Sequence, residues 1–315
     1  MSTSHIIEKC QANRPARGKK NALSFNSAKQ YASTIKNIAK RQNCGIDDLT
    51  YEKVWNDTKD ASPNDRRTRM SAVLVYNDDG NHIPFVSKLR DEIMNCKYAI
   101  DAKQFNDDGR EPTEKEKENL IPYDEVMEKY HTLEKRVKPF FRPGEQIPKS
   151  LMKLIQTYVL LSCYLLIPPR RALDFTEFKL RNINENEDNY MHVNKSKAQF
   201  IFNKYKTAYK YGKQVVDIPN SLKHIIMKWK SVTPSDYLLV GSTSGKPVFQ
   251  TTITNMLHNF FNKRISCNAL RKIVITHKDN KGQLNTHKKM RELAKDMGHS
   301  VETQQSVDYL KNMKL

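Results

Sequence analysis

Two polar residues near the end of the chain have a spacing that suggests covalent chemistry. His299 follows Gly298, and Tyr309 lies ten positions after the histidine and six before the last residue. Few apolar residues follow Tyr309, so the pattern does not place its ring inside a core helix. Such a phenol could instead act as a nucleophile, because tyrosine forms covalent intermediates in several classes of enzyme.

Five upstream residues have the charges and hydrogen-bonding groups that such a nucleophile would need. Arg171 follows the most apolar stretch of the chain and precedes Asp174 by three residues, while Lys206 lies in an expected hairpin turn. Asn268 and Arg271 share one side of an expected helix because they are three residues apart. Taken singly, each has an ordinary explanation as a solvated side chain on a turn or helix. A lone histidine is likewise more often structural than catalytic.

Taken as a set, these residues fit an attack on a phosphodiester bond. The reaction needs a nucleophile, cations on the non-bridging oxygens and an acid that protonates the leaving oxygen. A phenol, with a pKa near ~10, needs help in losing its proton. Arginine bonds two phosphate oxygens at once, and lysine is a movable proton donor. The sequence has no metal-ligand cluster and guanidinium groups can carry the developing charge, so no cofactor is expected.

The composition indicates a partner of negative charge. The 315 residues include 54 Lys and Arg against 35 Asp and Glu, a net charge of +19. Residues 141–315 have 29 basic and 13 acidic side chains, a net charge of +16, and residues 1–41 have nine and one. Such a distribution is typical of proteins that bind nucleic acid with an affinity that falls as salt rises. A generic basic protein from a lysine- and asparagine-rich proteome is the alternative.

The apolar segments and the cysteines indicate an intracellular, reducing compartment and no membrane partner. The most apolar run, residues 151–167, is interrupted by polar residues and is short for a membrane span. The N-terminus lacks the apolar segment of a secretory signal. Five cysteines are scattered without metal-ligand or disulfide spacing, which favours free thiols.

The sequence predicts a basic arm, two domains and a linker. Residues 1–22 show no helical periodicity and are basic, which favours a flexible arm, although a localisation signal would have the same composition. Apolar periodicity predicts an all-α domain of four helices within residues 23–138. These helices are expected at 24–41, 64–76, 84–105 and 123–137. The prolines and glycine around 139–148 predict a linker.

Residues 149–315 are predicted to form an α+β domain, so the fold class is mostly α with a small β-sheet. The apolar helix over residues 151–167 should lie at its centre. Alternating apolar residues predict three strands, at 190–193, 198–203 and 214–218. Further helices are expected at 220–230, 251–262, 266–276, 286–297 and 301–310.

The order of these residues resembles that of the tyrosine recombinase, or phage integrase, family. Arg171-Ala172-Leu173-Asp174 matches the first box of the family, and Lys206 stands in its β-hairpin. Asn268-Ala269-Leu270-Arg271 stands where the family has His-x-x-Arg. Gly298-His299 matches the Gly-His box, and Tyr309 matches the nucleophile. The resemblance covers the linker through to the C-terminus, and before the linker it is limited to a small helical domain with a basic arm.

The resemblance implies a role for each residue. Tyr309 would form a 3′-phosphotyrosyl link and release a 5′-hydroxyl without metal or ATP. The sequence leaves open whether it acts in its own subunit or in a neighbour, and we expect its own. Arg171 and Arg271 would bind the scissile phosphate, and Asp174 would hold Arg171 in place. Lys206 would protonate the leaving oxygen, and His299 would support the transition state. The helical core-binding domain and the catalytic domain would together form a C-shaped clamp on DNA.

One position departs from the family pattern. Asn268 can donate a hydrogen bond to a phosphate oxygen, but it cannot accept a proton as a histidine would. His277 and His287 lie nearby in the sequence, but neither precedes an arginine at the spacing of the box. We therefore keep Asn268 as the candidate for this position.

The resemblance implies a site-specific DNA recombinase or integrase, of a virus or another mobile element. Its partners would be double-stranded DNA and three further copies of the chain, in a tetramer on two duplexes during synapsis, with a monomer possible in solution. If the source is viral, the host nucleus or cytoplasm is expected. Two alternatives stay open, a type IB topoisomerase and a catalytically inactive DNA-binding protein on the same scaffold. Candidate DNA contacts are Arg14, Arg17, Lys19, Lys20, Arg66, Arg67, Arg69, Lys204 and Lys210.

Overall fold

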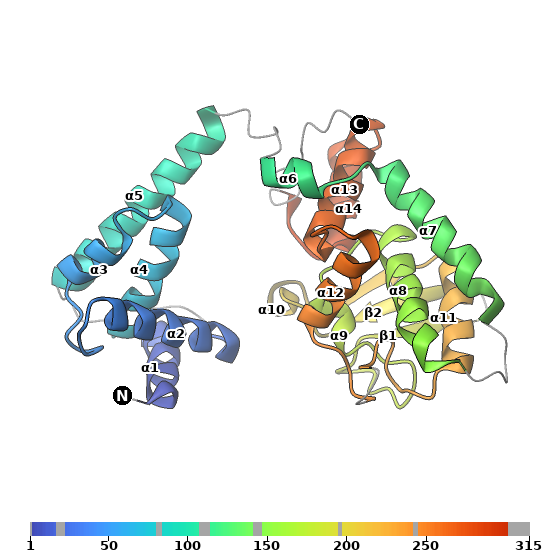
Figure 1. Cartoon of the computed structure of the whole chain (residues 1–315), viewed down its shortest axis with the longest axis horizontal. Helices are drawn as coiled ribbons and strands as arrows, with labels where there is room; N and C mark the ends of the chain where they lie inside the picture. The colour runs from blue at the N-terminus through green and yellow to red at the C-terminus, as the bar shows by residue number, and fades with distance from the viewer. Residues whose placement is uncertain are drawn as a thin grey trace. The chain divides into compact units, whose positions relative to one another are not determined.

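The chain forms two compact units, residues 1–108 and 109–315, each with its own core. The computed structural model describes residues 2–16, 23–79, 84–106, 114–140, 147–194, 197–241 and 245–301. The first unit is built of helices, and the second packs helices around a small sheet (Figure 1). The structure is therefore mostly α with a small β-sheet, as the sequence predicts.

The first unit contains five helices in its described part. They are α1 (Thr3–Ala16), α2 (Phe25–Arg41), α3 (Tyr51–Thr58), α4 (Pro63–Asn77) and α5 (Pro84–Asn106). Ser24, Thr50 and Ser62 cap α2, α3 and α4, because each side chain accepts a hydrogen bond from a backbone N–H of the first turn. The predicted domain of four helices is thus wrong in detail, since α1 and α3 belong to this unit.

Helix α1 replaces most of the predicted flexible arm. Ile6, Ile7 and Cys10 are buried in the core of the first unit, and Asn13 Nδ2 donates to the carbonyls of Val75 and Tyr76 at 3.1 and 2.7 Å. The helix is therefore held by tertiary contacts of a few residues. Its apolar residues are too sparse to give a periodic pattern. Residues 17–22 lie outside the described part.

The second unit begins earlier than predicted. Helix α7 (Tyr123–Val137) buries Val126 and Leu133 in the same core as α8 (Lys149–Leu165). The division between the units therefore falls after residue 108 rather than in a linker at 139–148. Pro139 and Pro148 thus stand between α7 and α8, two helices of one core, and do not mark the end of a domain.

The remaining elements of the second unit keep the predicted order of strands and longer helices. They are α6 (Glu114–Asn119), the 3₁₀ turn η1 (Lys138–Phe140), α9 (Leu173–Thr176), β1 (Tyr190–Val193), β2 (Ala198–Phe202), α10 (Ala208–Tyr211), β3 (Gln214–Asp217), α11 (Asn220–Val232), α12 (Gln250–Phe261), α13 (Cys267–Asn280) and α14 (His287–Asp296). The three strands are antiparallel in the order β1-β2-β3, with Phe200 opposite Met191 and Val216. All three predicted strands are confirmed, and the short α6, η1 and α10 were not predicted.

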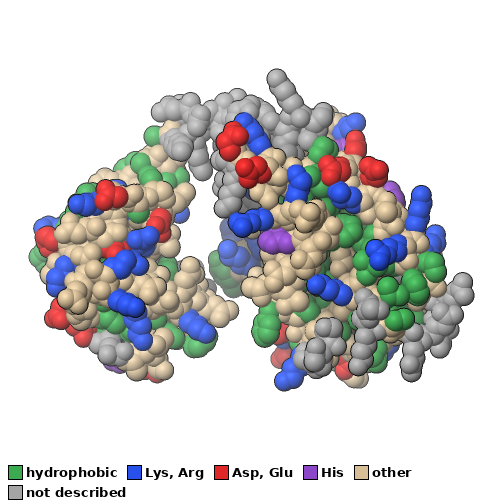
Figure 2. Space-filling model, in the orientation of Figure 1, with side chains coloured by type: hydrophobic (Ala, Val, Ile, Leu, Met, Phe, Trp, Pro, Cys, Tyr) green, Lys and Arg blue, Asp and Glu red, His purple; other side chains and the backbone are tan. Residues whose placement is uncertain are grey.

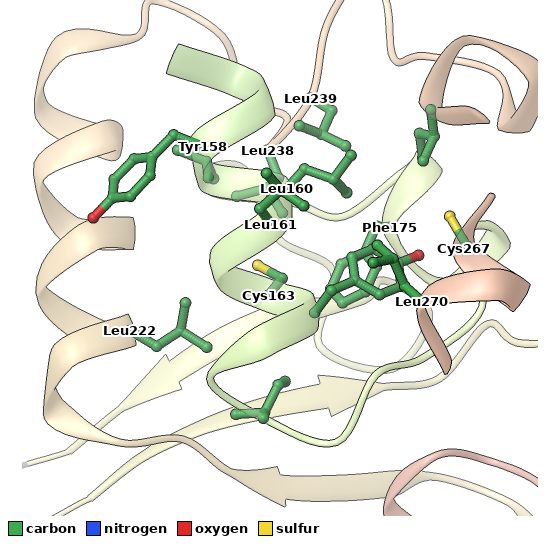
Figure 3. Packing of buried hydrophobic residues seen from close by; sticks show 14 of the residues in the cluster. Tyr158, Leu160, Leu161, Cys163, Phe175, Leu222, Leu238, Leu239, Cys267 and Leu270 are labelled. Atoms are coloured by element: carbon green, nitrogen blue, oxygen red, sulfur yellow. The ribbon is translucent and has the colours of Figure 1, made fainter. Parts of the chain in front are cut away.

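Helix α8 lies at the centre of the second unit, as predicted. Its apolar residues point to several sides, so neighbouring helices and the sheet can pack around it (Figure 3). Phe175 of α9 contacts the rings of Phe200 and Phe202 of β2 at centroid distances of 6.3 and 6.0 Å. Leu270 of α13 belongs to the same core. This core therefore holds α9, which carries Asp174 of the first box, and α13, which carries Asn268 and Arg271.

No helix in the described ranges is both long and apolar enough to span a bilayer.

Candidate active site

The end of helix α14 forms a turn that positions His299. The N–H of Gly298 donates to the carbonyl of Lys295, and the N–H of His299 donates to that of Ala294, both at 3.0 Å. This pair of bonds is a Schellman cap, which needs a left-handed residue after the helix. Gly298 supplies it with a φ of +66°. The Gly-His pair of the sequence is thus a helix stop that fixes the backbone of His299.

The side chain of His299 is held by Arg271 of α13. Arg271 Nη2 lies 2.9 Å from His299 Nδ1, and both residues are buried. A guanidinium can only donate, so the Nδ1 atom must accept this bond. The ring proton of the neutral imidazole is then on Nε2. His299 is therefore arranged as a hydrogen-bond donor through Nε2.

Arg171 approaches the same turn from the first box. Its Nη1 donates to the carbonyl oxygen of Gly298 at 2.6 Å, and the side chain stays partly exposed. Thr207 Oγ1 donates to the same oxygen at 3.2 Å. Lys206, the residue before Thr207, is exposed. The Gly298 carbonyl therefore joins the first box and the hairpin to the Gly-His turn.

Asp174 bonds a different arginine from the one expected. Its Oδ2 accepts from Arg170 Nε at 2.7 Å, and both side chains are fully buried. The prediction that Asp174 holds Arg171 is wrong in this respect, because α9 places the carboxylate one turn after Arg170. Burial raises the pKa of Asp174, and the neighbouring Arg170 opposes that rise. From the sequence, Arg171 is preferred to Arg170 because Asp174 falls three residues after it. That spacing leaves out Arg170, the residue that Asp174 bonds.

Asn268 lies on the first turn of α13, exposed, and three residues before the buried Arg271. His277 does not substitute for it. The two are nine residues apart in one helix, about 14 Å along its axis, and the His277 ring stacks on Tyr123 at 4.0 Å. His287 is exposed at the start of α14. Asn268 thus remains the candidate at this position.

The candidate nucleophile and part of the candidate DNA surface lie outside the described residues. These are Tyr309, Arg17, Lys19 and Lys20, together with the side chain of Arg14. The helix expected at 301–310 is described only at its first residue, Val301, which is helical.

The basic side chains of α4 are partly used within the first unit. Arg66 pairs with Glu92 at 2.9 Å and covers the Trp55 ring at 4.9 Å. Arg69 pairs with Asp57 and Asp65. Basic and acidic side chains alternate over this unit in Figure 2. Arg67 is the exposed member of the three, so it is the better candidate for a phosphate contact.

The hairpin between β2 and β3 presents cations and aromatic rings together. Lys204 lies 3.8 Å from Asp188, and Lys210 lies 5.0 Å from the centre of the Tyr211 ring. Tyr209 is 77% exposed. Exposed rings among lysines are typical of surfaces that contact nucleic acid.

A cavity of about 260 Å³ opens beside His299. Its wall includes Tyr211 and the basic residues Arg291 and Lys295 of α14. These two cations could accommodate an anion. Within the described ranges, no group of three or more His, Cys, Asp and Glu side chains could hold a metal ion.

Comparison with known proteins found similar solved structures but no similar sequence family. No protein-family model and no curated protein matches the chain. The crystal structure of the XerA recombinase is similar with a TM-score of 0.41 and 13% identity, over 99% of this chain and 95% of that one. The XerH site-specific recombinase, bound to its palindromic difH substrate after cleavage, is similar with a TM-score of 0.54. That likeness covers 99% of this chain and 82% of the XerH chain, at 12% identity.

The chain has the tyrosine-recombinase fold. On this fold, the structure brings three residues of the expected site together around the Gly298 turn. They are Arg171, Arg271 and His299. Lys206 is exposed beside Thr207, which donates to the Gly298 carbonyl. Asn268 is exposed on α13, the helix that carries Arg271.

Proposed function

We propose that the protein is a site-specific DNA recombinase that cuts and rejoins strands through a tyrosine. One observation carries the proposal. Arg171, Arg271 and His299 come from three segments that are far apart in the sequence, and they meet at one turn. These groups can surround a phosphate with guanidinium and imidazole donors, which is the arrangement that stabilises a pentavalent phosphorus.

Each residue then has a defined part in the reaction. The Tyr309 oxygen attacks the phosphorus, a new P–O bond forms to the tyrosine, and the P–O5′ bond breaks. Lys206 gives its proton to the departing 5′-oxygen, and the phenol proton passes to water. The arginines and His299 Nε2 neutralise the non-bridging oxygens, and Asn268 donates one further hydrogen bond.

The first step conserves the phosphodiester linkage. One phosphodiester is exchanged for another, so a 5′-hydroxyl of the same or a second strand can reverse the attack and seal the break without ATP. Attack by a hydroxyl from a second duplex gives recombination. A tetramer on two duplexes would bring such strands together, and its net positive charge would favour association with DNA.

The substrate we propose is double-stranded DNA, as supported by two observations. The chain has a net charge of +19, and the structurally similar XerH was crystallised with a palindromic DNA substrate. Phosphate contacts release counterions, so binding should weaken steeply with salt. We further propose a virus or mobile element as the source of the gene, and integration or excision as the outcome.

Covalent capture tests this function. The full chain is incubated with nicked duplexes of randomised core sequence, and adducts that resist SDS are recovered and sequenced. We expect adducts with wild type and none with Tyr309→Phe or Arg171→Ala. Joining of two different duplexes would establish recombination, and relaxation of supercoils without joining would instead indicate a topoisomerase. Salt-sensitive binding with no adduct on any duplex would leave an inactive DNA-binding protein and overturn the proposal.

A further inference from the structure

A buried arginine stands behind the candidate site without being exposed to any substrate. Arg170 is fully buried, in contrast to its neighbour Arg171. Its guanidinium lies over the ring of Phe202 at 4.0 Å and near that of Tyr205 at 5.1 Å. The proposed mechanism gives this side chain no direct part, so its position needs another explanation.

Arg170 joins three elements, α9, β3 and α14, that contain or adjoin the segments of the site. Its Nε donates to Asp174 of α9 at 2.7 Å. Its Nη1 donates to Gln214 Oε1 of β3 at 2.7 Å and to the backbone carbonyl of Asp296 at 2.6 Å. Asp296 is the last residue of α14, directly before the turn that ends in His299. One side chain thus links the first box, the hairpin and the Gly-His turn.

The guanidinium also lies directly against Gly298. A Cβ atom on this glycine would come within 2.9 Å of Arg170 Nη2 and 3.3 Å of Cζ. The turn therefore rests on the guanidinium with no room for a side chain. The Gly298 carbonyl, in turn, accepts the hydrogen bond from Arg171.

This arrangement is a poor choice for stability alone. Arg170 Nη2 and Asp174 Oδ1 are buried and have no hydrogen-bond partner within the described part of the chain. Well-packed apolar residues often replace a buried ion pair with no loss of stability, and unsatisfied buried polar atoms are destabilising. An apolar side chain could not donate hydrogen bonds to the Asp296 carbonyl and to Gln214 Oε1 at the same time. The benefit of Arg170 is therefore geometric.

We propose that Arg170 is a positioning residue that fixes the Asp296–His299 turn and thereby sets Arg171 and His299 around the phosphate. The effect on the turn follows from the contacts alone, and the effect on cleavage rests on the proposed function. Lysine cannot replace Arg170, because a single ammonium on a flexible stem cannot reproduce the planar fork that bonds all three acceptors.

Amide exchange tests the effect on the turn without DNA. The matched variants are Arg170→Lys and Arg181→Lys, since Arg181 also donates to two backbone carbonyls, of Ser235 and Lys230, but away from the site. In Arg170→Lys we expect the Gly298 and His299 amides to exchange at least about 10-fold faster, because local opening follows the stability of that turn.

The comparison with other amides decides the result. In Arg170→Lys the amides of α8 should keep wild-type rates, and in Arg181→Lys the turn amides should do so. Unchanged turn amides in Arg170→Lys, or equal acceleration throughout the second unit, would overturn the proposal. Should Arg170→Lys not fold, the double variant Arg170→Met with Asp174→Asn removes both buried charges and takes its place in the same measurement.

Cleavage kinetics test the catalytic effect. On a duplex recovered by covalent capture, Arg170→Lys should lower the single-turnover cleavage rate about 10- to 100-fold, as misplaced catalytic groups do. The DNA dissociation constant should stay within about 2-fold of wild type because the side chain is buried. Arg181→Lys should change neither quantity. A wild-type cleavage rate in folded Arg170→Lys would overturn the catalytic part. If wild type itself formed no adduct, the proposed function would fail, and amide exchange would still decide the role of Arg170 in the turn.

Discussion

Replacing Gly298 by alanine should destabilise the second unit more than the same change at another left-handed glycine. Two effects add at Gly298. Its φ of +66° is strained for an alanine, at about 1–2 kcal/mol. The new Cβ would also lie 2.9 Å from Arg170 Nη2, and overpacking of this kind costs about 1–3 kcal/mol. The guanidinium cannot retreat without losing its bonds to Asp174, Gln214 and Asp296.

Gly282 provides a matched control for the first effect. Its φ is +65°, and no atom lies within 4 Å of the Cβ that an alanine would have. Gly282→Ala should therefore cost only the backbone strain, about 1–2 kcal/mol. Gly298→Ala should cost about 2–5 kcal/mol when strain and overpacking are combined. The difference between the two variants measures how firmly Arg170 is held against the turn.

Urea unfolding followed by tryptophan fluorescence can measure this difference. The chain has two tryptophans, Trp55 in the first unit and Trp229 in the second, so a Trp55→Phe background reports on the second unit alone. Trp229 is fully buried, and its indole donates to the Leu238 carbonyl at 2.8 Å. With a slope of about 2 kcal/mol per molar urea, the midpoint of Gly298→Ala should lie roughly 0.5–1.5 M below that of Gly282→Ala. Equal midpoints would refute the packing of Arg170 against the turn.

Three further predictions concern Lys206 and Asn268 of the candidate site and Arg67 of the candidate DNA surface. Lys206→Ala should lower the cleavage rate about 10²- to 10⁴-fold on ordinary DNA. A substrate with sulfur in place of the bridging 5′-oxygen should restore the rate, since a thiolate leaves without a proton. If the rate is not restored, Lys206 is not the acid. Asn268→His should raise the single-turnover cleavage rate because imidazole can also accept a proton, and a lower rate would show that the amide itself is required. Arg67→Ala should weaken DNA binding and reduce the magnitude of the slope of log affinity against log salt by about 1, the value for one phosphate contact. Arg66→Ala should mainly lower the stability of the first unit, since Arg66 is paired with Glu92.

The sequence predicts best those features that depend on local pattern. The strands at 190–193, 198–202 and 214–217 follow from alternating apolar residues, and helix α8 follows from its long apolar run. The grouping of Arg171, Arg271 and His299 could be expected only from their order and from the resemblance to a family. Their distances depend on how distant segments pack, which no local pattern contains.

Two features were predicted wrongly from the sequence, helix α1 and the partner of Asp174, and each error has a physical cause. Helix α1 is held by a few buried residues such as Ile6 and Cys10, and its stability comes from packing rather than from an amphipathic pattern. The choice of Asp174 between Arg170 and Arg171 depends on the turn of a four-residue helix. Spacing of three or four residues is compatible with either pairing, so only the three-dimensional structure could decide it.

The central claim is that Tyr309 becomes covalently linked to the 3′-phosphate of a cut DNA strand. The most direct test is mass spectrometry of the protein after capture on a nicked duplex and digestion with nuclease and protease. If Tyr309 is the nucleophile, the peptide that contains it carries a nucleotide phosphate, and Tyr309→Phe abolishes that adduct. A nucleotide on any other residue, or an adduct that persists in Tyr309→Phe, would contradict the claim.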